Sequence, residues 1–230
     1  ARRGPLGELI SSALSREVRF RERRVTLGAL CAEALPPLLL LGLVAGIFHR
    51  ILLEGDAPMG SDHPIHLFQG AVMADHLLPS GRLTGWVTLR GAGYPAGVLY
   101  PIGANLLLAV LRFVTPDSLP WDRVYALGFL LAMVLIHLST YLAGRWIGGP
   151  GVGLIAGFFS IVDIGAYRQS GWTFAVEWGV WPVSLSMAQA LLAIVVLHRA
   201  LTDAQKSWRS IALASILAGC SIVTHPMSLA

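Results

Sequence analysis

Long runs of apolar residues, separated by short polar stretches, dominate the pattern of this chain of 230 residues. A helix needs about 20 predominantly apolar residues to cross the hydrocarbon core of a bilayer. Five segments reach that length, and we expect each to form one spanning helix. They are residues 25–48, 124–144, 146–166, 178–198 and 210–228. The pattern therefore predicts an all-α integral membrane protein with about five transmembrane helices.

One further apolar segment, residues 101–114, is too short to span and is predicted to be interfacial or re-entrant. Residues 49–123 then form a long external first loop that carries amphipathic helices. This topology leaves Arg168 as the only basic residue of the opposing short loop at 167–177. The basic residues of the short cytoplasmic loops are Arg145, Arg199, Lys206 and Arg209. Such an asymmetry agrees with the positive-inside rule.

The first 24 residues carry the net charge of the chain. They hold seven arginines against three glutamates, whereas the remainder has ten basic and ten acidic residues. The tail, residues 1–24, is predicted to be cytoplasmic, either as an interfacial amphipathic helix built on Leu6–Leu14 or as a disordered positive flank. Residues 25–230 form the transmembrane domain. The chain stops after the last span without a basic anchor, so we expect an N-terminal portion of a longer protein.

Composition narrows the functional classes. Hydrophobic residues make up 55% of the chain and charged residues 13%, against about 25% charged in an average soluble domain. No basic patch interleaved with aromatic residues indicates nucleic-acid binding. No phosphate-cradling glycine loop or nucleophile elbow indicates a soluble-type enzyme. We expect a protein of a bacterial-type inner or plasma membrane, in contact with lipid and without a nucleic-acid partner.

Ionisable residues gather where the predicted spans meet the external side. The set comprises Asp56, Asp62, His63 and His66 after the first span, Asp163 and Arg168 after the third, Glu177 before the fourth and His225 after the fifth. Ionisable groups at the hydrocarbon boundary are costly unless they pair or take part in function. The sequence therefore predicts a site at this side of the membrane.

Several residues of this set have more than one interpretation. Asp62 is either a helix cap or a carboxylate that serves as general base or ligand of a hard cation. Asp56 competes for that role or occupies a turn. His63 and His66 lie three residues apart, and hydrogen bonds to phosphate or carboxylate are favoured over zinc because no third histidine or cysteine is near. His137, in mid-span, is predicted to be a packed histidine bonded to a neighbour.

The glycine- and proline-rich stretch that follows, residues 78–107, predicts an ordered external loop. Its aromatic residues Trp86, Tyr94 and Tyr100 suit a surface at headgroup level. Arg82 and Arg90 either clamp a phosphate or meet lipid headgroups.

These motifs resemble a multispanning membrane family labelled 6-pyruvoyl-tetrahydropterin-synthase-related and, more distantly, the GT-C glycosyltransferases. The resemblance covers about residues 50–230 and is most specific at 60–101. Its motifs are Asp62 with His66, "GRLTGW" at 81–86, "GYP" at 93–95, "YP" at 100–101, Glu177 at a helix start and Thr224-His225 at a helix end. Ile102 departs from the pattern, because a second proline is common there.

The resemblance implies a GT-C-like glycosyltransferase that uses a polyprenyl-phosphate-linked sugar at the external face. It implies Asp62 as base or metal ligand and Asp56 as a second carboxylate, with Mg2+ or Mn2+ as the expected cofactor. The residues expected to bind the lipid-linked sugar are His63, His66, Arg90, Arg168, Glu177 and His225. We also expect membrane lipid and partner membrane subunits as further contacts.

Two other functions stay open at this point. A non-catalytic GT-C-like subunit or scaffold that binds lipid or a partner chain fits the lack of a DxD pair, since Asp56 and Asp62 lie six residues apart. A transporter would place Asp163, Glu177 and His137 on a path through the bundle, although paired broken helices are not evident in the sequence.

Overall fold

The computed structural model describes residues 17–20, 23–88, 91, 93–98, 100–165, 171–202 and 207–226, and these residues are mostly helical. The helices are α2 (Leu27–Ile47), α3 (His49–Leu53), α4 (His63–Val72), α5 (Gly103–Val114), α6 (Trp121–Val162), α7 (Trp181–Thr202) and α8 (Trp208–Thr224). Short turns of π- or 3-10-helix form η1 (Met73–Leu77), η2 (Leu78–Ser80) and η3 (Thr173–Glu177). Two antiparallel hairpins pair β1 (Glu17–Phe20) with β2 (Arg23–Thr26) and β3 (Gly85–Val87) with β4 (Tyr94–Ala96).

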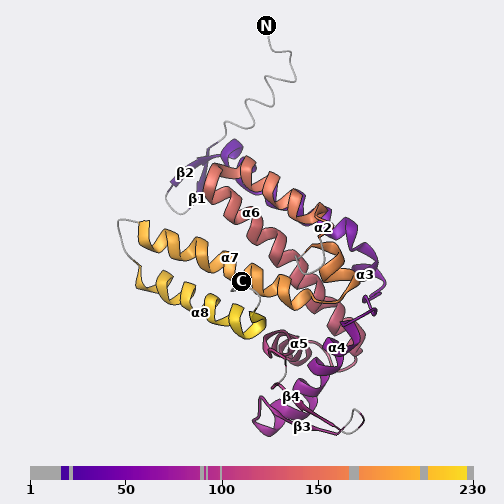
Figure 1. The fold of residues 1–230 in the computed structure, drawn as a ribbon. Helices are drawn as coiled ribbons and strands as arrows, with labels where there is room; N and C mark the ends of the chain where they lie inside the picture. The colour runs from indigo at the N-terminus through magenta and orange to yellow at the C-terminus, as the bar shows by residue number, and fades with distance from the viewer. Residues whose placement is uncertain are drawn as a thin grey trace.

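Helices α2, α6, α7 and α8 run alongside one another and form a bundle (Figure 1). Three segments are long and apolar enough to cross a membrane: Leu30–Ile47, Trp121–Val162 and Trp181–Thr202. Helix α8 is also apolar but has 17 residues. The chain is therefore a helical protein with apolar helices of spanning length, and the count of five spans stays a prediction.

Helix α6 contains the boundary that was predicted between its two expected spans. The backbone leaves the helical region at Gly148 and Gly149, within 42 residues of otherwise helical chain. The two halves then pack closely, because a Cβ added at Gly144 would lie 2.8 Å from the Cβ of Ala156. A Cβ added at Gly153 would lie 2.7 Å from the carbonyl oxygen of Tyr141. Small residues thus let the two halves fold back against each other.

Large apolar side chains are exposed on the outside of the bundle. Examples are Leu38 on α2, Phe159 on the second half of α6 and Ile216 on α8, which are 60%, 64% and 62% exposed. Burial inside the bundle instead favours aromatic and small residues such as Tyr125 and Ala132, both 0% exposed. A surface of this kind suits an apolar solvent, which agrees with helices that lie in lipid.

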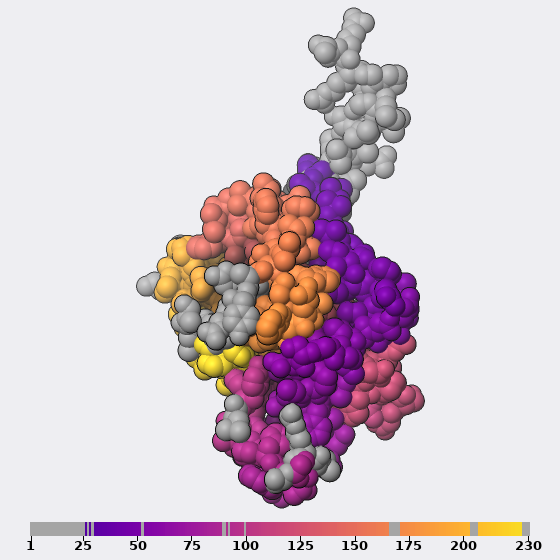
Figure 2. All heavy atoms as spheres, turned by 45° about the vertical axis from the view of Figure 1, so that its right-hand side comes forward, coloured from indigo at the N-terminus to yellow at the C-terminus, as the bar shows by residue number. Residues whose placement is uncertain are grey.

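The segment between α3 and α6 forms a compact unit at one end of the bundle, which we call the outer module: α4, η1, η2, β3, β4 and α5. Figure 2 shows that it protrudes from that end. Its own apolar core includes Met73, Leu77, Val87 and Ala109. Helix α5 is seen nearly end-on in Figure 1, whereas α6, α7 and α8 run across the view. This 12-residue helix therefore does not run parallel to the bundle helices.

The structure describes the N-terminal tail only near its end, at residues 17–20 and 23–26. The strands β1 and β2 pair in antiparallel register, with Val18 opposite Val25, and lie at the end of the bundle opposite the outer module (Figure 1). The arginine-rich end of the tail is therefore extended. The amphipathic helix expected at 6–14 lies outside the described residues.

Candidate functional site

The start of α4 is held against the chain that follows η3. The backbone N–H of Asp62 donates to the carbonyl oxygen of Trp178 at 3.1 Å. Gly179 has a positive φ of 76°, and an added Cβ there would lie only 2.6 Å from the backbone nitrogen of His63. The structure thus brings together the chain around Asp62 and the chain around Glu177, which are far apart in sequence.

His63 is fully buried in a directed chain of hydrogen bonds. Its Nε2 lies 2.7 Å from the carbonyl oxygen of Val176, so this nitrogen carries the proton and donates. Its Nδ1 therefore accepts from the hydroxyl of Tyr125 at 2.6 Å. The Tyr125 oxygen in turn accepts from the indole N–H of Trp181 at 2.8 Å.

This network leaves neither ring nitrogen of His63 for a substrate. Burial lowers the pKa of His63, an effect opposed by the hydrogen bond to Val176 and by the charge of Asp62. The ring is therefore neutral and ties α4 to α6 and to the segment of η3. Its expected role in substrate binding stays a prediction, and the geometry favours a structural role.

His66 is in the opposite situation. Its side chain is 1% exposed, and neither ring nitrogen has a hydrogen-bond partner among the described residues. The ring contacts Tyr100 at 5.2 Å and Trp181 at 6.0 Å between centroids. Burial, together with the nearby His63 and His225, lowers the pKa of His66 to about 4. Because an unpaired buried polar group costs about 1–3 kcal/mol, His66 is the residue whose position most needs an explanation.

Tyr100 links His66 to the end of α8. Its ring lies 5.7 Å from that of His225, between centroids. The carbonyl of His225 accepts a hydrogen bond from Ser186 at 2.8 Å, which joins this end of α8 to α7. Burial, reinforced by the charge of Asp62, raises the pKa of Tyr100 to about 12. The phenol is therefore protonated and can act as a donor.

Asp62 sits at the N-cap position of α4, with Pro64 in the first turn as the sequence predicts. Its carboxylate makes no capping hydrogen bond and no hydrogen bond or ion pair with the described residues. The preceding residue, Ser61, has a positive φ of 50°, which is unusual for a residue other than glycine. Asp62 is thus a partly buried carboxylate without a protein partner in the described part of the chain.

Asp56, unlike Asp62, has a charged partner in the protein. Its carboxylate forms an ion pair with Arg50 at 2.7 Å, and Arg50 also contacts Glu54 at 3.3 Å. Within the described ranges, no three His, Cys, Asp or Glu side chains are placed to hold a metal ion. The expected Mg2+ or Mn2+ site between Asp56 and Asp62 therefore does not fit the donors as they are arranged here.

Arg123, which the sequence analysis did not single out, places a cation against the chain between α3 and α4. Its guanidinium packs directly over Gly55, where an added Cβ would overlap it. Arg123 directly precedes the buried residues Val124 and Tyr125. It makes no ion pair with a described residue. The one sequence signal for Arg123 was its place directly before the predicted span 124–144.

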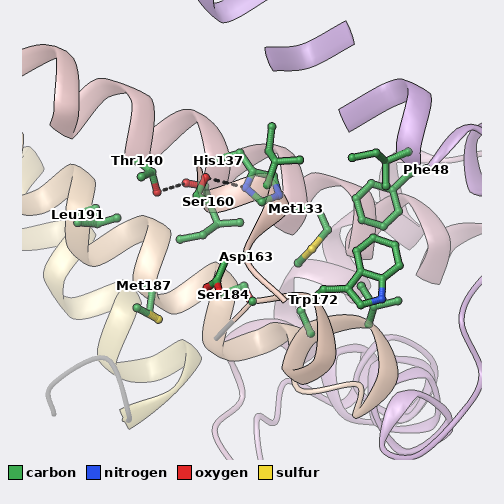
Figure 3. A pocket seen from close by; sticks show the side chains of 16 residues that line it. Phe48, Met133, His137, Thr140, Ser160, Asp163, Trp172, Ser184, Met187 and Leu191 are labelled. Carbon is green, nitrogen blue, oxygen red and sulfur yellow. Dashed lines mark hydrogen bonds between the residues drawn. The ribbon is translucent and has the colours of Figure 1, made fainter. Parts of the chain in front are cut away.

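Asp163 and His137 line a separate cavity of about 120 Å3 between α2, α6, η3 and α7 (Figure 3). His137 Nδ1 lies 3.0 Å from the hydroxyl of Ser160, which confirms the expected bond to a neighbour. The Asp163 carboxylate accepts from the backbone N–H of Gly165 at 3.0 Å. Most of the lining is apolar, with Phe48 and Trp172 at one side.

Of the remaining predicted site residues, the structure describes two and leaves two outside the described ranges. Glu177 and His225 lie at the same end of the bundle as Asp62, whereas Arg90 and Arg168 lie outside the described residues. Sequence reasoning missed Tyr125 and Trp181 as partners of the histidines, because aromatic residues near span ends are also typical membrane-interface anchors.

Comparison of this chain with protein-family models, with curated proteins and with solved structures gives no match.

Proposed function

We propose that this chain is a GT-C-like membrane glycosyltransferase that takes a sugar from a polyprenyl-phosphate donor at the external face of the membrane. The observation that carries the proposal is Asp62, a partly buried carboxylate without a partner in the described chain, at the bundle end where apolar helices and the outer module meet. A carboxylate left unpaired at such a boundary is costly, which points to a role in function.

The proposed topology has five spans: α2, the two halves of α6, α7 and α8, with a cytoplasmic N-terminus. At the end of the bundle opposite the outer module, two contacts join α6 to α2 and to α7, which supports this topology. Arg145 pairs with Glu33, which joins α6 to α2. Trp146 packs on His198 at 4.2 Å between ring centroids, which joins α6 to α7. Basic residues near this end fit a cytoplasmic surface.

In the proposed reaction, Asp62 accepts the proton of the acceptor hydroxyl as its oxygen attacks the anomeric carbon of the sugar. The bond from that carbon to the phosphate oxygen breaks, and polyprenyl phosphate leaves. The positive charge of Arg123 is suited to offset the charge that develops on this phosphate. No step is assigned to a metal ion, because the carboxylate of Asp56 is engaged by Arg50.

With a volume of about 120 Å3, the cavity in Figure 3 has room for a short part of the donor's hydrocarbon. Its wall includes Phe48, Met133, Trp172, Met187 and Leu191, side chains that suit an isoprenoid chain. Flexible methionines also adapt well to ligands of irregular shape. A donor held there by its hydrocarbon would meet its acceptor at the membrane surface, which lowers the entropic barrier to transfer.

The test uses the purified chain in lipid nanodiscs with polyprenyl-phosphate-linked hexoses and pentoses, and follows the release of polyprenyl phosphate in the presence of candidate acceptor glycans. We expect Asp62→Asn to lower turnover by at least about 100-fold, as loss of a general base does. Asp117→Asn, which changes an exposed carboxylate on the α5–α6 connection, is the matched control and should retain turnover. Full turnover by Asp62→Asn would exclude Asp62 from the reaction.

One observation favours a second function, that of a non-catalytic subunit that binds lipid or a partner membrane chain. The only carboxylate expected to assist Asp62 is held by Arg50, and His63 is fully bonded within the protein. In that case every donor would stay intact in the same assay, while lipid or a partner chain would copurify with the protein.

A further inference from the structure

A second pocket lies on the outer module, between the end of η1 and the β3–β4 hairpin. Its volume is about 280 Å3. At about 30 Å3 per water molecule, it has room for a small anion together with part of an attached alcohol. None of the residues that line it belongs to the group around Asp62.

A tight reversal of the chain builds this pocket. Gly81 has a left-handed backbone with φ of 66° and ψ of 25°, which ends η2. The backbone N–H of Gly81 then bonds the carbonyl of Leu78 at 2.9 Å, and that of Arg82 bonds the carbonyl of Leu77 at 3.0 Å. The hairpin strand is thereby brought back over the end of η1, because Gly85 allows close approach to the Leu77 side chain.

The floor of the pocket is apolar and its rim is polar. Leu77 and Val87 form the floor and belong to the core of the outer module. The polar residues Arg82, His76 and Thr88 also line the pocket, and all three are exposed. Ser80 also lines the pocket, but its hydroxyl donates to the carbonyl of His76 at 2.9 Å and has no proton left for a ligand.

The charge of this pocket is not balanced by the described residues. No carboxylate lines it, and Arg82 makes no ion pair with a described residue. The nearest acidic residue in sequence, Asp75, instead accepts a hydrogen bond from the indole of Trp121 at 3.3 Å. A guanidinium with neighbouring N–H and O–H donors is the usual arrangement for binding a phosphate.

Trp86 borders the pocket with its indole 65% exposed. The ring is packed against Gly93, where an added Cβ would lie 2.4 Å from the indole nitrogen. An exposed indole in a fixed position suits the boundary between apolar and polar parts of a ligand. It thus offers an apolar contact to the group that carries the phosphate.

We propose that this pocket binds the phosphate of a phosphate ester, with Arg82 as the main charged contact and Thr88 and His76 as further donors. The ester belongs either to a lipid headgroup or to a soluble compound, since both present the same group. This site is independent of the proposed transferase reaction, because it shares no residue with it.

The first arm of the test titrates inorganic phosphate and glycerol 3-phosphate into the purified chain in detergent and follows binding by 31P NMR. The second arm compares binding of the chain to nanodiscs of phosphatidylcholine with and without phosphatidylglycerol. We expect Arg82→Gln to weaken phosphate binding by about tenfold or more, as loss of a charged hydrogen bond does. Thr88→Val should weaken it by a smaller factor.

Arg199→Gln is the matched control, because it removes the same charge from an exposed position at the end of α7. It should leave binding unchanged, and thermal melting of each variant verifies its fold. Binding in the first arm that depends on Arg82 would assign a soluble phosphate ester, and such binding in the second arm alone would assign a lipid headgroup. The proposal is overturned if neither arm shows binding, if Arg82→Gln binds as the wild type does, or if succinate binds as tightly as glycerol 3-phosphate.

Discussion

The imidazole of His63 donates to the carbonyl oxygen of Val176 at 2.7 Å, across 113 positions of the chain. Through Tyr125 and Trp181, the same ring is connected to α6 and α7. This hydrogen-bond chain positions α4, and therefore Asp62, relative to the bundle. The stability of the chain and the geometry of the candidate site should consequently depend on the same few side chains.

Replacement of Tyr125 by phenylalanine tests this hydrogen-bond chain. The change removes the acceptor of the Trp181 indole and the donor to His63, and leaves both groups buried without a partner. We expect a loss of about 2–6 kcal/mol in the free energy of unfolding, at about 1–3 kcal/mol for each of the two unpaired groups. Denaturation in mixed micelles measures this loss.

Tyr141→Phe is the matched control for that variant. Tyr141 also lies in α6 and is 1% exposed, but its hydroxyl has no partner among the described residues. Removal of that hydroxyl should leave stability unchanged or raise it. An equal loss in both variants would contradict the role assigned to Tyr125.

His66 should make stability depend on pH. Its pKa is lowered from about 6.5 in the unfolded chain to about 4 in the folded protein. Between these values the unfolded chain binds more protons, so stability is full above pH 6.5 and falls as pH decreases toward 4. The total loss amounts to about 3 kcal/mol.

Melting temperatures between pH 7.5 and pH 4.5 give the measurement. His66→Phe removes the titrating ring without breaking a hydrogen bond to a described residue, so its melting temperature should vary less with pH than that of the wild type. At pH 7.5 the variant should be at least as stable as the wild type. A pH dependence as steep as that of the wild type would rule out His66 as its source.

Gly179→Ala should separate α4 from the chain after η3. The new methyl group would meet the backbone of Asp62 and His63, which cannot move as a flexible side chain can. We expect a loss of at least about 2 kcal/mol in stability, from the strained positive φ together with the steric overlap.

The control for Gly179→Ala is Gly81→Ala, at a position with a similar positive φ of 66° and no atom within 4 Å of an added Cβ. It should show only the backbone cost of about 1 kcal/mol. Similar losses in the two variants would mean that the close approach at Gly179 contributes nothing.

Labelling with a membrane-impermeant maleimide tests the proposed topology. The native cysteines, Cys31 and Cys220, are first replaced by alanine, and single cysteines are then introduced at Met59, Asp117 or Leu201, all of which are exposed. Positions 59 and 117 should react from the same side of a sealed vesicle, and position 201 only after lysis or from the other side. If 59 and 117 reacted from opposite sides, α5 would span the membrane and the proposed topology would be wrong.

Hydropathy predicted the bundle helices because each apolar run is bounded by polar or helix-breaking residues. The predicted segment 25–48 became Leu27–Ile47, and 178–198 became Trp181–Thr202. The limits of 210–228 shifted to Trp208–Thr224, since Thr224-His225 ends the helix before Pro226. The expected turn near residue 145 lies a few positions later, at Gly148 and Gly149.

The sequence did not predict which side chains the individual site residues contact. Asp56 pairs with Arg50, which lies six positions earlier in the chain. Nothing in the sequence pattern shows whether Asp56 takes this local partner or a distant one. The chain of His63, Tyr125 and Trp181 depends on how three distant elements pack, and no spacing in the sequence encodes it. The hairpin at 85–96 also depends on tertiary contacts, because its strands have only three residues each and pack against the core of the outer module.

The contact between α5 and the end of α8 has a consequence for biosynthesis. Gly103 lies so close to Thr224 that an added Cβ would come within 2.6 Å of its Cα, and Tyr100 rests on His225. The ribosome makes the outer module more than a hundred residues before these partners. The enclosure around His66 is therefore completed only after α8 has been synthesised, so a chain released before residue 224 would lack a finished site.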